Sequence, residues 1–182
     1  MDLILDARYT LVSSTRARLA GLRLGMEYRR VHRFGMGIYN LGDGVRVDTL
    51  AELGPKVDEA ILNLSYLSLF YERVIFFSPK WEFSLTGHVG SGSITGRYRN
   101  VESDTWTEFP ERKVRPVELS GSLYFHPTWW FSVGGGVGYR FMRSTPPEVR
   151  PIYNAPVAIA KVRIRLGRLV KSTWDKEVKY EY

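Results

Sequence analysis

The arrangement closest to a catalytic site lies in the segment 81–89, where Glu82, Ser84 and His88 alternate with apolar residues. A serine, a histidine and a carboxylate are the groups of a hydrolytic triad, so a lipid-hydrolysing site is one hypothesis for this segment. Residues two apart on an extended strand are separated by about 7 Å, too far for a direct triad within one strand. We therefore predict that His88 belongs to a hydrogen-bond network and that the chain has no catalytic residues.

Metal, cofactor and nucleic-acid chemistry find little support. The chain has three histidines, no cysteine and no closely spaced histidine pair, and His32 and His126 fall in predicted tight turns, where we expect them to be exposed. The glycines of 134–138 lack the spacing and the following helix of a phosphate loop. The basic run 161–168 has no aromatic stacking platform, so we expect ion pairs there and no nucleic-acid partner. Neither a metal nor a cofactor is expected.

The composition is that of one folded domain. Charged residues make up 25%, the hydrophobic set 44% and aromatic residues 14% of the 182 residues, with a net charge of +7. No apolar run is long enough for a transmembrane helix. The first six residues lack the features of a secretory signal, so an exported protein would need a signal that was removed or lies upstream.

Alternation of apolar and polar residues is the strongest regularity, and it predicts strands with two different faces. The clearest examples are 81–89 and 129–142, while 61–73 is weakest, with Leu62, Leu64 and Tyr66 on its apolar face. Eight strands are predicted, at 3–12, 18–29, 33–40, 61–73, 80–92, 115–126, 129–142 and 155–167. Most approach the ~9–11 residues that cross a bilayer at a tilt.

The predicted connections alternate between short turns and long loops. The turns hold 30–32, 78–80 and 126–128, and the loops are 41–60, 93–114 and 143–154. Transmembrane barrels have short periplasmic turns and longer external loops, and only the first connection, 13–17, is short for an external loop. Trp106 and Phe109 are the loop aromatics that we expect to contribute to recognition.

The polar face carries glycine together with charges of both signs, which suits a narrow lumen with paired side chains better than a soluble surface. The residues predicted to form this lumen network are Asp6, Arg8, Arg23, Glu27, Arg29, Glu82, His88, Glu118, Arg140, Lys161, Arg163 and Arg165. Aromatic residues near strand ends are expected at the membrane interfaces: Tyr28, Trp81, Trp129, Trp130, Phe131, Tyr139 and Phe141.

Segments such as 24–29, 34–39 and 130–141 resemble strands of small bacterial outer-membrane β-barrel proteins. The resemblance covers 3–167 and implies a fold and a location in the cell outer membrane more than a reaction. One departure is that the last predicted strand ends near Gly167, whereas such proteins often end on an aromatic residue closing that strand.

We therefore predict an all-β chain: an eight-stranded antiparallel up-and-down transmembrane β-barrel over 1–167, followed by a short tail over 168–182 that is amphipathic or disordered. Its predicted role is structural or in surface recognition, with the lipid bilayer as a partner and lipopolysaccharide as a candidate partner. Two alternatives remain: a lipid-modifying membrane enzyme, and a soluble lipocalin-like barrel carrying a small apolar ligand. The soluble barrel would point Leu85, Val133 and Ile164 towards the barrel axis.

Overall fold

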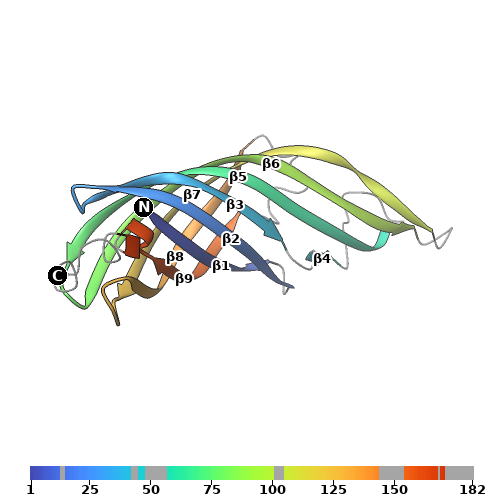
Figure 1. Ribbon diagram of the computed structural model, residues 1–182. Helices are drawn as coiled ribbons and strands as arrows, with labels where there is room; N and C mark the ends of the chain where they lie inside the picture. Colours follow the sequence, from blue (N-terminus) through green and yellow to red (C-terminus); the bar gives the residue numbers. More distant parts are fainter. Residues whose placement is uncertain are drawn as a thin grey trace.

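The computed structural model describes residues 1–12, 15–41, 45–47, 57–100, 105–143, 154–167 and 169–170 (Figure 1). Its strands are β1 (Asp2–Val12), β2 (Thr15–Tyr28), β3 (His32–Leu41), β4 (Val45–Val47), β5 (Val57–Phe77), β6 (Trp81–Asn100), β7 (Trp106–Phe125), β8 (Phe131–Arg143) and β9 (Ala155–Ile164).

The long strands form one closed antiparallel sheet. Its order is β3-β2-β1-β9-β8-β7-β6-β5-β4, and pairing between β3 and β5 closes it into a barrel. Among the described residues, β4 is a short addition that pairs only with β5, so the barrel itself has eight strands. The predicted eight-stranded antiparallel barrel is therefore confirmed. Closure leaves no open edge around the wall, which is what a sheet within a bilayer requires.

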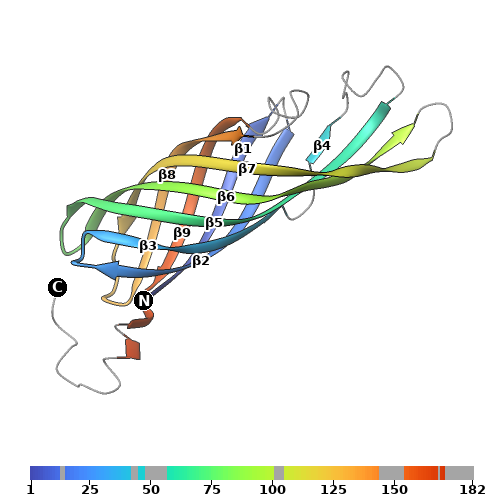
Figure 2. The same ribbon diagram turned by 90° about the horizontal axis from the view of Figure 1, so that it is seen from above.

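One end of the barrel carries the short β2–β3, β5–β6 and β7–β8 turns, together with the N-terminus (Figure 2). This is the periplasmic end in barrels of this type. At the other end β5, β6 and β7 extend well beyond the remaining strands. These three strands contain 21, 20 and 20 residues, so most of the predicted loop 93–114 is strand. The predicted loop 41–60 likewise contains β4 and the start of β5, and 144–153 lie outside the described residues.

The outer wall of the lower barrel is apolar. Leu85 and Val133 point outward, 44% and 38% exposed, and Ile164 lies on the same outward face of β9. Large apolar side chains on neighbouring strands share this outward orientation, including Leu22, Met36, Leu69 and Leu119. These positions exclude the lipocalin-like alternative, which requires such side chains at the barrel axis.

In the upper part of β5 and β6 the polar residues face outward and the apolar residues face inward, which is the reverse of the lower barrel. On β5, Asn63 and Ser65 point outward, while Leu62 and Leu64 are buried. These leucines join a buried apolar cluster whose other members are Ala17, Leu19, Tyr39, Leu41, Tyr66, Ile94, Val114 and Met142. The outward placement expected for Leu62, Leu64 and Tyr66 was therefore wrong. Above the apolar wall the outer face meets water, so burial of apolar groups favours the inside there.

Little of the predicted tail is described. Leu166, Gly167, Leu169 and Val170 are helical, and 171–182 lie outside the described residues, so the role of the tail stays a prediction. No helix in the described part of the chain is long and apolar enough to cross a membrane.

The outward face of β5 changes from apolar to polar along the strand, and arginine substitutions on this face test that change. Leu69→Arg should lower the free energy of unfolding by about 2–4 kcal/mol, because Leu69 lies on the apolar wall and the charge would face hydrocarbon. Asn63→Arg on the same face should change it by less than about 0.5 kcal/mol, because Asn63 faces water. Urea unfolding of protein refolded in lipid vesicles, followed by tryptophan fluorescence, measures both. Equal losses for the two variants would contradict an apolar wall that ends between them.

Candidate functional site: the charged lumen

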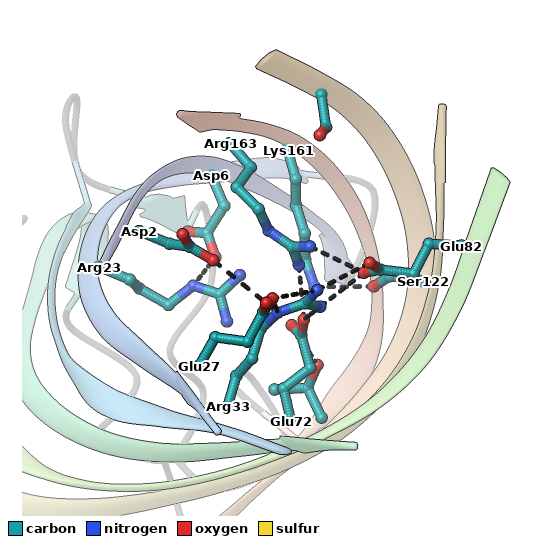
Figure 3. A network of polar contacts seen from close by, with 12 residues as sticks. Asp2, Asp6, Arg23, Glu27, Arg33, Glu72, Glu82, Ser122, Lys161 and Arg163 are labelled. Atoms are coloured by element: carbon teal, nitrogen blue, oxygen red, sulfur yellow. Dashed lines mark hydrogen bonds and ion pairs between the residues drawn. The ribbon is translucent and has the colours of Figure 1, made fainter. Parts of the chain in front are cut away.

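A cluster of two carboxylates and two guanidinium groups lies at the centre of the lower lumen (Figure 3). Arg33 on β3 donates to Glu82 on β6 at 2.6 Å and 2.7 Å and to Glu72 on β5 at 2.9 Å. Arg163 on β9 donates to the same carboxylates, at 2.8 Å to Glu82 and 2.5 Å to Glu72. Each carboxylate is thus shared by two guanidinium groups, and β9 is tied across the interior to the three neighbouring strands β3, β5 and β6.

A second group of ion pairs involves β1, β2, β7 and β8. Arg8 contacts Glu118 at 2.8 Å and Asp6 at 3.1 Å. Arg23 contacts Asp6 at 3.3 Å, and Arg140 contacts Glu118 at 3.1 Å. All five side chains are buried, so each charge is held away from bulk water and needs these partners.

His88 lies beside Arg8 and Arg23 and not beside a serine. Its Nε2 is 3.2 Å from Arg8 Nη2 and 3.5 Å from Arg23 Nη1, so a neutral ring accepts hydrogen bonds from the guanidinium groups. Tyr39, whose hydroxyl accepts from Arg8 at 2.6 Å, completes the surroundings of His88. Ser84 is buried with no hydrogen-bond partner among the described residues. The nucleophile–base contact that a hydrolytic triad needs is therefore not formed between His88 and Ser84.

Strand alternation explains why these side chains meet. Within each strand every second residue faces the lumen, so Asp6 and Arg8 share a face, as do Lys161 and Arg163. Small residues opposite them provide the space. A Cβ on Gly37 would lie 2.7 Å from Arg23 Cγ, and one on Gly21 would lie 2.2 Å from both an Asp6 oxygen and the Tyr39 ring.

Positive and negative charges nearly balance within the described lumen. The buried cations are Arg8, Arg23, Arg33, Arg140, Lys161, Arg163 and Arg165. The carboxylates facing them, all buried except the half-buried Glu27, are Asp2, Asp6, Glu27, Glu72, Glu82 and Glu118. Arg163 also lies 3.8 Å from the centre of the Tyr124 ring, and Lys161 donates to Ser122 at 2.7 Å. In the described part of the chain, no group of three or more histidine or acidic residues could hold a metal ion.

One predicted member of the lumen network lies elsewhere. The structure places Arg29 in the β2–β3 turn, exposed, with a φ of 52° and its guanidinium over the Tyr28 ring. The strand ends at Tyr28, so alternation no longer directs the next side chain inward. The other eleven predicted residues face the lumen, although Glu27 is only half-buried.

Three charged lumen residues were missed: Asp2, Arg33 and Glu72. Asp2 lies at the start of β1, on its predicted polar face, but was not included in the predicted network, and Arg33, near the start of β3, was not assigned to a face. Glu72 lies in the segment with the weakest alternation. Asp2 and Arg33 have the parity of neighbouring polar-face residues, which was the available signal. Glu72 instead shares the parity of Leu62 and Leu64, so alternation would have assigned it to the outer face.

The predicted interface aromatics lie near both ends of the outer wall. Tyr28 and Trp81 are exposed beside the tight turns, Trp129 and Trp130 lie within the β7–β8 turn, and Phe131 begins β8. Tyr139 and Phe141 lie in the upper half of β8, with ring centres 4.6 Å apart. Of the two aromatics expected to contribute to recognition, Trp106 is exposed at the start of β7, and the Phe109 side chain lies outside the described set.

His126 closes the lower end of the lumen. Its expected exposure was wrong, because the side chain turns inward and is only 7% exposed. Its Nδ1 lies 2.8 Å from Ser132 Oγ, and Arg165 and Glu82 lie beside the ring. Burial, reinforced by the Arg165 charge, lowers the pKa of His126 to about 4, and the opposing effect of Glu82 is smaller.

Loss of Arg163 should be costly. We expect Arg163→Met to lower the free energy of unfolding by about 3–5 kcal/mol, because it removes one of the two guanidinium groups bound to the buried carboxylates of Glu72 and Glu82. Arg29→Met removes the same charge from an exposed turn and should change stability by less than about 0.5 kcal/mol. Urea unfolding in vesicles compares the two variants. A small effect of Arg163→Met would show that the cluster contributes little to stability.

His126 should make the fold sensitive to mild acid. The folded pKa of about 4 lies below the usual value of 6.5, so the unfolded chain binds the extra proton first and stability falls as pH drops below about 6.5. Between pH 7 and pH 5 we expect a loss of about 1–2 kcal/mol that is absent in His126→Asn. Urea midpoints at several pH values measure the difference. A parallel dependence in both proteins would assign the loss to other groups.

The chain is similar in structure to the crystal structure of Neisserial surface protein A, with a TM-score of 0.56 and 9% sequence identity over 90% of this chain and 94% of that chain. Ail, the attachment invasion locus protein of Yersinia pestis, gives a TM-score of 0.43 at 12% identity, over 89% and 92% of the two chains. No family model matches the sequence. No curated protein matches it either. The shared fold is that of a small outer-membrane β-barrel, and the apolar outer wall with paired charges inside is the arrangement of a barrel that spans a membrane.

Proposed function

We propose that this barrel is a non-conducting outer-membrane protein that presents the extended part of β5, β6 and β7 for recognition at the cell surface. The observation that carries the proposal is the change of faces on β5, where polar residues such as Asn63 face outward at the base of this extension while Leu62 and Leu64 join the apolar cluster inside the upper barrel. The name of Neisserial surface protein A agrees with a surface role.

Two layers of side chains favour a closed lumen over a pore. The lower layer is the network of ion pairs around Glu72 and Glu82. Above it lies the apolar cluster that includes Leu64, Tyr66 and Ile94, each buried. An eight-stranded barrel is narrow enough for side chains to fill its interior. A lipid-modifying enzyme is less well supported, because His88 contacts arginines, and His126, which does contact Ser132, is buried at the lower end of the lumen beside Arg165.

The outer edge of the extension favours recognition through side chains. β8 pairs with β7 only from Arg115 onward, so no described strand covers this edge over residues 106–114. Pro110 lies on the uncovered edge and cannot donate a backbone hydrogen bond, and charged residues follow it directly. Proline and charge on an edge strand oppose the addition of another strand.

The exposed side chains of the extension include cations of both faces and one aromatic ring. The guanidinium of Arg97 lies 4.9 Å from the centre of the Trp106 ring, and both residues are exposed. Arg112 and Lys113 are also exposed, against Glu108 and Glu111. An aromatic ring with neighbouring cations suits an anionic polymer, and we therefore expect such a partner.

Binding to an anionic polysaccharide tests the proposal. Cells displaying the protein should bind immobilised dextran sulfate more than neutral dextran, and Arg97→Ala with Trp106→Ala should reduce binding by about tenfold through loss of cation and ring contacts. Arg29→Ala, which removes a cation at the opposite end, is the matched control and should leave binding unchanged. Equal binding of both variants would contradict recognition at this surface.

Conductance is measured separately, with purified protein in planar bilayers. No stepwise currents are expected, because the ion-pair network and the apolar cluster fill the lumen. Discrete open levels would show that the lumen conducts and would contradict the non-conducting part of the proposal.

A further inference from the structure

A groove crosses the outer wall of the barrel, on the side away from the lumen. One part of it has a volume of about 630 Å³ and lies over β2, β3, β5 and β6. A second part of about 500 Å³ adjoins it over β8, β9, β1 and β2, and the two parts share Leu5, Ala20 and Gly21. Volumes of this size are ordinary for sites that bind small ligands.

A single row of small outward residues forms the floor of the groove. Strand pairing places these residues directly beside one another, in the order Gly135, Ala160, Ala7, Ala20, Asn40 and Ser65. The row continues to Ser93 on β6, and Ser93 pairs with Lys113 on β7. A row of large residues borders it on the periplasmic side, made of Leu5, Leu22, Ile38 and Leu67. The groove therefore results from a step in side-chain size along the wall.

The groove rises along the barrel as it crosses the strands. Gly135 lies close to Phe131, at the periplasmic end of β8, whereas Ser93 lies far above Trp81, at the periplasmic end of β6. Its polarity changes in the same direction. The lower half is lined by Gly135, Ala160 and Ala7, the upper half by Asn40, Ser65 and Ser93, and the exposed cation Lys113 follows.

The change from apolar to polar to cationic residues along the groove matches an amphiphile that lies along the wall. Its apolar end would be in the bilayer and its anionic group at the outer surface. Arg115 lies two residues from Lys113 on the same outward face of β7, and Arg143 pairs opposite Arg115, so exposed cations gather where the groove ends. Glu111 lies further out along β7. Several cations beside one apolar groove favour a lipid carrying more than one phosphate.

We propose that the groove binds one acyl chain of lipopolysaccharide, with a phosphate of its lipid A headgroup at Lys113 and Arg115. The chain lies over Ala7 and Ala20, between the leucines below and Tyr9 and Arg18 above. This site adjoins the recognition surface around Trp106, with which it shares Lys113, but it does not depend on recognition there and requires only that the barrel spans the membrane.

Native mass spectrometry of the refolded protein in detergent, with purified diphosphoryl lipid A as the probe, tests the site. The wild type should carry one lipid A, and Ala20→Phe should reduce the occupancy of lipid A by about tenfold or more. The phenyl ring would fill the floor of the groove, and loss of contact with about two methylene groups of the acyl chain is enough for a tenfold weaker binding. Leu119→Phe adds a ring elsewhere on the outer wall and should bind as the wild type does. Heat-modifiable gel mobility checks that every variant is folded. Equal occupancy in Ala20→Phe and wild type would overturn the proposal.

A second comparison identifies the headgroup. Lys113→Ala should weaken binding of diphosphoryl lipid A by about tenfold and flatten its salt dependence, while Lys80→Ala, an exposed cation at the periplasmic end, should not. If phosphatidylglycerol binds as tightly and with the same dependence on Ala20, the occupant is a phospholipid and the assignment to lipopolysaccharide is wrong. If Ala20→Phe instead abolishes a dimer peak and no lipid is bound, the groove is an interface between two copies of the chain.

Discussion

The pairing of charges inside the barrel is the interaction on which the rest of this structure depends. Arg33 and Arg163 each bind both Glu72 and Glu82, and these four residues come from four different strands. An arginine or glutamate inside a narrow lumen cannot reach bulk water, so its charge is tolerated only where a partner is held in place. The strand register must therefore bring opposite charges to the same height, and glycines such as Gly37 must leave room for the long side chains. The strand register, the charges in the lumen and the positions of the glycines therefore depend on one another.

A second constraint acts from outside. The wall is apolar where it faces lipid, as Leu69 and Leu85 show, and polar where β5 and β6 extend beyond it, as Asn63 and Thr95 show. Inside the barrel the order is reversed, with charges below and the cluster around Leu64 and Ile94 above. Hydrophobic burial explains both halves, because apolar groups face lipid where lipid is present and face the interior where the surroundings are water. A single strand such as β5 thus has apolar residues on its outer face in its lower part and on its inner face in its upper part.

These two constraints separate three regions that can act independently. The lumen ties the barrel together through ion pairs between its strands. The extension carries exposed cations and Trp106 into the external medium. The outer wall contains a groove whose residues change from alanine to serine and then to lysine. The two proposed sites therefore lie at different heights on the outward face of the same β6–β7 pair.

The sequence by itself determined the class of fold, because alternation with a period of two marks strands with two different faces, and the sequence contains enough such segments for a small barrel. It also identified most of the lumen charges, since residues such as Arg8, Glu118 and Arg163 share the parity of their polar neighbours. Only the tertiary structure decided where along a strand the apolar residues change from the outer face to the inner face. Leu62 and Leu64 look lipid-facing by composition, yet they are buried because β5 leaves the membrane there. His126 and Arg29 both fall near turns, and the path of the chain buries one and exposes the other. The groove is equally invisible in the sequence, because its floor is assembled from small residues that only the register of neighbouring strands brings into one row.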